Sequence, residues 1–158
     1  MVRAFEILVL SGALAAAAPA FAWETSASSG GGFQAKQSAA AAIKGHGGAA
    51  GKAVLVVSCR SDGLFVTVQW PDEIPLNENQ HFVSVAWSLD GGSNSSSMLA
   101  TSGSVGLAGS EAKEWLSEIA GAKRLEVHVP DAHGGQSAGF DLAGAKAVQD
   151  GIARSSCG

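Results

Sequence analysis

The sequence of 158 residues lacks an extended cluster of basic side chains. It has ten lysines and arginines against fourteen aspartates and glutamates, a formal net charge of −4. No basic cluster exceeds the pair Lys123-Arg124. Nucleic acids and anionic lipids both attract proteins through a concentrated positive patch. We therefore expect neither a nucleic acid nor an anionic membrane surface as a partner.

The sequence also lacks an apolar run long enough to cross a bilayer as a helix. Its one sustained run, at 7–18, falls short of the roughly 20 residues that such a helix needs. Arg3 precedes this run and Ala20-Phe21-Ala22 follows it, an order typical of a signal peptide with its cleavage site. We interpret 1–22 as a signal peptide and expect a periplasmic or secreted protein without a stable membrane anchor after cleavage.

Cysteine is scarce, since Cys59 and Cys157 are the only two. They form no C-x-x-C motif, which disfavours a redox or nucleophilic thiol. Two cysteines in one small exported domain most often form a disulfide. Closing a loop of this length stabilises a fold by up to about 4–5 kcal/mol on the chain-entropy argument. We predict a Cys59–Cys157 disulfide.

Composition divides the remaining chain into two parts. Residues 23–52 are rich in glycine, alanine and serine, which bury little surface and cost entropy to order. This part is predicted to be mostly loop, with a short strand near 33–38 or a helical turn near 39–44. Residues 53–158 are predicted to form a single α+β domain with one core.

Alternating apolar residues predict strands joined by turns such as Asp62-Gly63 and Asp90-Gly91. Six segments are expected to be strands: 53–59, 64–70, 82–89, 95–103, 124–130 and 137–142. A helix is expected to begin at a Ser110 cap, with an apolar stripe of Ala112, Trp115, Leu116 and Ile119. A second helix is expected at about 143–155. The predicted fold class is α+β, an antiparallel sheet of about six strands with two helices packed on it, in the order ββββ-α-ββ-α with one disulfide.

Ser137 lies in a G-x-S-x-G match at 135–139, the pattern of a hydrolase nucleophile elbow. That elbow needs a strand-to-helix turn and a histidine later in the chain. Here a strand is expected to follow, and no histidine occurs after His133. His128, Asp131 and His133 lie near one hairpin, but a metal site needs three or four converging ligands. We assign no residue to catalysis, a cofactor or a metal.

Asp72, Glu73 and Glu78 lie in the proline-containing loop at 71–79. Their spacing does not follow a calcium-binding loop. Because loops on a rigid sheet commonly carry recognition, these residues are expected to form part of a partner-binding surface. The tryptophans Trp70, Trp87 and Trp115 lie on inward stripes, which favours core packing over sugar binding.

The order of motifs resembles the type VI secretion-associated VasI/TagO family of small exported proteins. The resemblance is carried by VVSC at 56–59 and by FDLAG at 140–144 followed by Cys157. That family similarly pairs a cysteine at a strand end with one after a terminal F-x-L-x-G helix. A looser similarity of layout is to the invasion-associated locus B proteins. The resemblance implies a non-enzymatic periplasmic accessory protein.

The expected function is therefore that of a small exported accessory or binding protein of the bacterial envelope, associated with type VI secretion, that acts through a protein partner. Two alternatives remain: a small periplasmic hydrolase that uses Ser137 or the His128/Asp131/His133 hairpin, and an inhibitor of a hydrolase.

Overall fold

The computed structural model of the chain describes residues 22–28, 32–44, 50–130 and 135–158. The predicted signal peptide, apart from residue 22, lies outside the described residues. The strands are β1 (Glu24–Ser28), β2 (Gly32–Ser38), β3 (Ile43–Lys44), β4 (Ala50–Gly51), β5 (Val54–Arg60), β6 (Gly63–Gln69), β7 (Phe82–Leu89), β8 (Gly92–Thr101), β9 (Ser104–Ala108), β10 (Arg124–Val129) and β11 (Gln136–Asp141). The helices are α1 (Gly109–Gly121) and α2 (Ala145–Ala153).

The predicted fold class, with about six strands in the order ββββ-α-ββ-α, is wrong. The described chain is mostly sheet: nine antiparallel strands pair in the order β1-β2-β5-β6-β9-β8-β7-β10-β11, and β3 and β4 form a separate pair. Two of the additional strands, β1 and β2, come from the Gly/Ala/Ser-rich segment predicted to be mostly loop; of the two alternatives given there, the short strand near 33–38 is present as β2 and the helical turn near 39–44 is not. The third additional strand, β9, follows a turn at 102–103. This turn ends the segment 95–103, which was predicted as one strand, and β9 lies beyond that segment.

Backbone pairing explains why the Gly/Ala/Ser-rich segment forms strands in spite of its composition. Ala35 of β2 lies opposite Val57 of β5, and Gln37 lies opposite Leu55. The ladder satisfies the backbone donors and acceptors of β2, and the sheet covers its small side chains. Pairing with β5 thus outweighs the weak intrinsic preference of this segment for strand structure.

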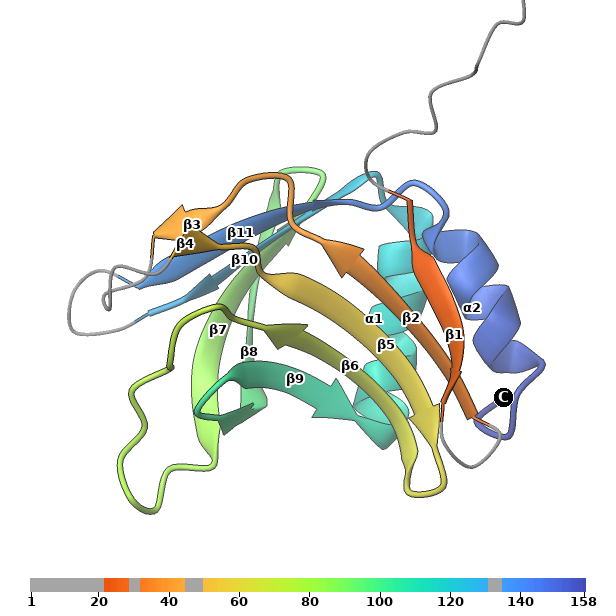
Figure 1. Cartoon of the computed structure of the whole chain (residues 1–158), viewed down its shortest axis with the longest axis horizontal. Helices are drawn as coiled ribbons and strands as arrows, with labels where there is room; N and C mark the ends of the chain where they lie inside the picture. The colour runs from red at the N-terminus through yellow and green to blue at the C-terminus, as the bar shows by residue number, and fades with distance from the viewer. Residues whose placement is uncertain (1–21, 29–31, 45–49, 131–134) are drawn as a thin grey trace, which may run out of the picture.

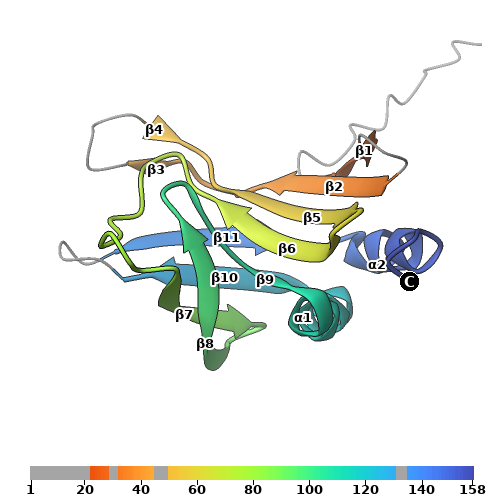
Figure 2. The same cartoon turned by 90° about the horizontal axis from the view of Figure 1, so that it is seen from below.

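The sheet bends so strongly that its β11 edge meets the chain that follows β2. The two views show β2, β5 and β6 in one layer and β10 and β11 in the other (Figure 1; Figure 2). Ala40 N donates a hydrogen bond to the Gly139 carbonyl oxygen at 2.9 Å. The buried side-chain amide of Gln37 donates to the Asp141 carbonyl oxygen. These contacts cover part of a strand edge that would otherwise expose unpaired backbone groups.

The core lies between the two layers, and the predicted inward faces are confirmed for most strands. Leu55, Val57 and Cys59 of β5 are fully buried. Alternate residues of β6 and β10 are buried as well, namely Leu64, Val66, Val68, Leu125, Val127 and Val129. In contrast, Trp87 and Leu89 of β7 are only partly buried against this core.

The two helices pack against each other at one end of the molecule (Figure 2). Helix α1 contacts β6 and β9 and buries the predicted stripe of Ala112, Trp115, Leu116 and Ile119. Helix α2, which lies within the predicted range 143–155, buries Ala145, Val148 and Ile152. The predicted Ser110 cap is wrong, because the N-cap is Ala108 and no side chain caps it. Gly109, at φ 61°, turns the chain from β9 into α1.

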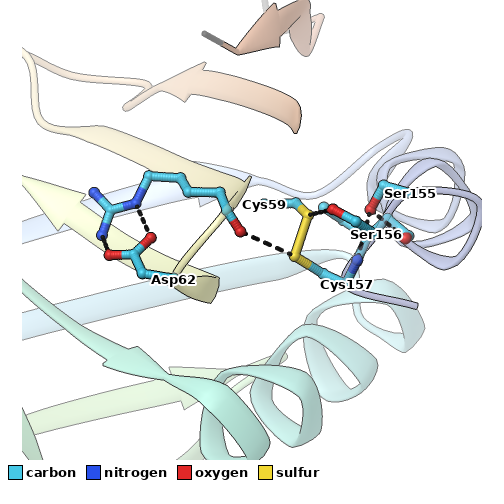
Figure 3. Close-up of a disulfide and its surroundings, with 7 residues drawn as sticks. Cys59, Asp62, Ser155, Ser156 and Cys157 are labelled. Carbon is cyan, nitrogen blue, oxygen red and sulfur yellow. Dashed lines mark hydrogen bonds and ion pairs between the residues drawn. A yellow bond between two sulfur atoms is a disulfide. The ribbon is translucent and has the colours of Figure 1, made fainter. Parts of the chain in front are cut away.

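The Cys59–Cys157 disulfide is present, as predicted, and joins the end of β5 to the chain after α2 (Figure 3). The two Cα atoms lie 5.8 Å apart. Cys59 is fully buried, and the Ser156 hydroxyl lies 3.4 Å from its Sγ atom. Helix α2 also packs closely against β2. Gly151 lies so near the Phe33 ring that a Cβ atom added to this glycine would be only 2.8 Å from the ring.

We predict that Cys157→Ala lowers the free energy of unfolding by about 2–5 kcal/mol, because the open unfolded chain regains the entropy of a long loop. Urea unfolding of the oxidised protein measures this change. Ser156→Ala is the control, because it keeps the disulfide and removes only one exposed hydroxyl. Equal urea midpoints for Cys157→Ala and the wild type would show that the disulfide is not a stabilising constraint.

Candidate functional site

The loop between β6 and β7 carries the predicted surface residues Asp72, Glu73 and Glu78, and lies at the end of the molecule opposite α2 (Figure 1; Figure 2). Glu73 and Glu78 are exposed, whereas Asp72 is partly buried. The Asp72 carboxylate accepts a hydrogen bond from the Glu73 backbone N–H at 3.0 Å. Two of the three predicted carboxylates thus face solvent.

This loop is held against the turn between β8 and β9. The buried side chain of Ile74 anchors its first half, and Ile74 N donates to the Ser102 carbonyl oxygen at 2.7 Å. At the other end, Ala100 N donates to the His81 carbonyl oxygen at 2.9 Å. A loop fixed at both ends presents its side chains with little entropy left to lose on binding.

An apolar pair lies where this loop enters β7. Phe82 and Leu99 are the two large exposed apolar side chains in the described part of the chain, at 56% and 44% exposure. They lie directly opposite each other on β7 and β8, so their exposed surfaces form one patch. A single exposed apolar residue is ordinary, but a contiguous pair beside an anchored loop is typical of an interaction surface.

We define the apolar-acidic surface as Phe82, Leu99 and the loop residues Asp72, Glu73 and Glu78. The sequence-based prediction of a partner surface named the three acidic residues and did not name the apolar pair. A signal was present: if Val83 and Val85 point inward, Phe82 must point outward. Leu99 gives no such signal, because the serine-rich segment before it has no clear alternation.

Ser137 and His128 lie opposite each other on β11 and β10, and His128 Nδ1 is 2.8 Å from Ser137 Oγ. The sequence-based prediction did not foresee this contact. The pair lies at a shallow cavity of about 340 Å³ that Arg124 and Glu126 also line. Asp131 and His133, the other candidates on this hairpin, lie outside the described residues.

The surroundings of Ser137 differ from those of a nucleophile elbow. Ser137 lies within a strand and not at a strand-to-helix turn. A catalytic histidine is normally oriented by a third group. In the described chain the nearby Glu126 carboxylate instead pairs with the Arg124 guanidinium at 3.0 Å, and no carboxylate contacts His128. The pair has the distance of a nucleophile and base, but no group among the described residues orients the base.

Within the described residues, no group of three or more histidine, cysteine, aspartate or glutamate side chains lies close enough to hold a metal ion. Trp70 and Trp115 are buried, as core packing predicts, and Trp87 is partly buried. Trp23 also packs against the core.

No protein-family model, curated protein or solved structure matches the chain. Neither described helix is long and apolar enough to cross a membrane. The disulfide is compatible with an oxidising compartment.

We predict that the double variant Phe82→Ser/Leu99→Ser changes the free energy of unfolding by less than about 1 kcal/mol, because the pair already contacts water and a cross-strand pair contributes little. The matched control is the neighbouring buried Met98, where Met98→Ala should cost about 2–5 kcal/mol. Urea unfolding compares the two variants. If the double variant unfolds as easily as Met98→Ala, the pair serves the fold and is not a free surface.

Proposed function

We propose that this chain is a small exported binding protein of the bacterial envelope that acts through a protein partner and not by catalysis. The single observation that carries the proposal is the exposed Phe82–Leu99 pair beside the anchored acidic loop. Burying this pair against a partner would remove apolar surface from water, the usual driving force of association.

The charges around the pair indicate the chemistry of the partner. Glu73 and Glu78 are exposed, and the loop from residue 71 to residue 80 carries no lysine or arginine. A complementary surface would present an apolar side chain flanked by basic ones, because opposite charges steer association and select among partners. We therefore propose a protein with an apolar-basic surface as the partner.

For the biological process we propose type VI secretion. This part of the proposal rests on the resemblance of VVSC, FDLAG and Cys157 to the VasI/TagO family. It predicts that genes for secretion components lie beside the gene for this chain.

We predict that the wild-type protein captures a periplasmic partner and that Phe82→Ser/Leu99→Ser captures at least about tenfold less of it, since an apolar hot spot typically contributes 2 kcal/mol or more. The control is Lys146→Ser, on the exposed side of α2 at the opposite end. Quantitative mass spectrometry of the captured proteins measures the ratio. Equal capture by the double variant would contradict the proposal that the apolar-acidic surface binds the partner. Capture of no protein above the bead background would contradict the binding function itself.

A second candidate function, a small hydrolase, is favoured only by the 2.8 Å contact between Ser137 and His128. In that function Ser137 Oγ would attack the acyl carbon of an ester while His128 takes its proton; the bond to the alcohol would then break as His128 returns the proton to it, and water would release the acid from Ser137. A third, an inhibitor of a hydrolase, differs from the first only in its partner, which would be an enzyme.

We predict that the protein hydrolyses p-nitrophenyl acetate and butyrate no faster than its Ser137→Ala variant, because no described residue orients His128. Release of nitrophenol measures the rate. Ser84→Ala, an exposed serine on β7, controls for the loss of a surface hydroxyl. A rate that falls in both Ser137→Ala and His128→Asn, but not in Ser84→Ala, would establish the hydrolase.

A further inference from the structure

A separate cavity of about 390 Å³ lies between α1 and the β7–β8 hairpin. Trp87 of β7 and Trp115 of α1 line it, together with three glutamates of α1: Glu111, Glu114 and Glu118. We call this site the tryptophan-glutamate groove. It shares no residue with the apolar-acidic surface.

The tryptophans of the groove are held in fixed positions. The rings of Trp87 and Trp115 pack edge to face, with their centroids 5.9 Å apart and an angle of 68° between their planes. The Trp87 indole N–H also donates to the Ser96 hydroxyl at 3.1 Å. Trp87 remains partly exposed, so it offers part of a pre-oriented ring to a ligand. Such a ring attracts cations through its π electrons.

The three glutamates follow one side of α1, because positions separated by three, four or seven residues share a helix face. All three are exposed, and no described residue forms an ion pair with any of them. Glu114 and Glu118 are four residues apart, a spacing at which like charges destabilise a helix. Glu118 also lies in the last turn, where the helix dipole disfavours a carboxylate. This arrangement carries a stability cost that an external cation would remove.

The spacing indicates an extended ligand and not a single metal ion. From Glu111 to Glu118 the helix rises about 10 Å. The described side chains form no cluster that could hold a metal. In addition, Trp115, which lines the groove, has a buried indole N–H with no hydrogen-bond partner in the described chain.

We infer that the tryptophan-glutamate groove binds a segment of a partner protein that carries arginine side chains. The planar guanidinium stacks on an indole face and forms paired hydrogen bonds with a carboxylate, so it uses both kinds of group that line the groove. Lysine supplies the charge without the planar fork and is expected to bind more weakly. This inference does not depend on the apolar-acidic surface.

The test uses the full disulfide-bonded protein and three capped tripeptides: Arg-Gly-Arg, Lys-Gly-Lys and Gln-Gly-Gln. The indole N–H signals of Trp87 and Trp115 in NMR spectra, followed during titration, report binding at the groove. The variant Glu114→Gln/Glu118→Gln removes two carboxylates. The variant Glu73→Gln/Glu78→Gln makes the same change of charge on the distant loop.

We expect Arg-Gly-Arg to bind more tightly than Lys-Gly-Lys, Gln-Gly-Gln not to bind, and the groove variant to bind Arg-Gly-Arg about tenfold more weakly than the loop variant. The groove variant should also unfold at a urea concentration at least equal to that of the wild type, because it removes a like-charge pair. A purely structural role for the glutamates predicts a groove variant that unfolds at a lower urea concentration than the wild type.

No shift of the indole signals with Arg-Gly-Arg at millimolar concentration, or equal weakening of peptide binding in both variants, would overturn the inference. Phe82→Ser/Leu99→Ser should leave peptide binding unchanged, so this test and that of the proposed function can fail separately.

Discussion

The disulfide between Cys59 and Cys157 is the constraint on which the rest of the structure depends. It joins the buried end of β5 to the last residues of the chain, so the C-terminal end cannot fray from the sheet. Through this link α2 stays against α1 and β2, where Gly151 allows the close approach of the Phe33 ring. The disulfide also limits the entropy of the unfolded chain, which matters because a glycine-rich segment must be ordered to complete the sheet.

The bent sheet determines which surfaces remain for recognition. Its β11 edge meets the chain after β2 through the Ala40–Gly139 bond, and both helices cover one end of the molecule. The β6–β7 loop and the Phe82–Leu99 pair remain uncovered at the opposite end, attached to an anchored hairpin. The tryptophan-glutamate groove follows from the same bend, because it brings Trp87 of β7 against Trp115 of α1. Both surfaces are therefore pre-organised by strands that the disulfide helps to hold.

Sequence patterns predicted those features that depend on local periodicity or on covalent chemistry. The disulfide is one, and the buried stripes that contain Trp115 and Val148 are others. The strand β1 was not predicted, because its residues, ETSAS, show no apolar alternation, and β2 was predicted only as the alternative of a short strand near 33–38. The Ser137–His128 contact and the Phe82–Leu99 pair depend on strand register, which a single strand does not reveal. The register between paired strands is thus the information that the patterns lacked.

The central claim is that this chain recognises a protein through its apolar-acidic surface. Photocrosslinking tests it most directly, with a benzophenone amino acid placed at Ser84, two residues along β7 from Phe82, or at Lys146 on α2. We predict that, in cells, the probe at Ser84 forms one discrete crosslinked species and that the probe at Lys146 does not form it. A species formed equally from both positions, or from Lys146 alone, would contradict the claim.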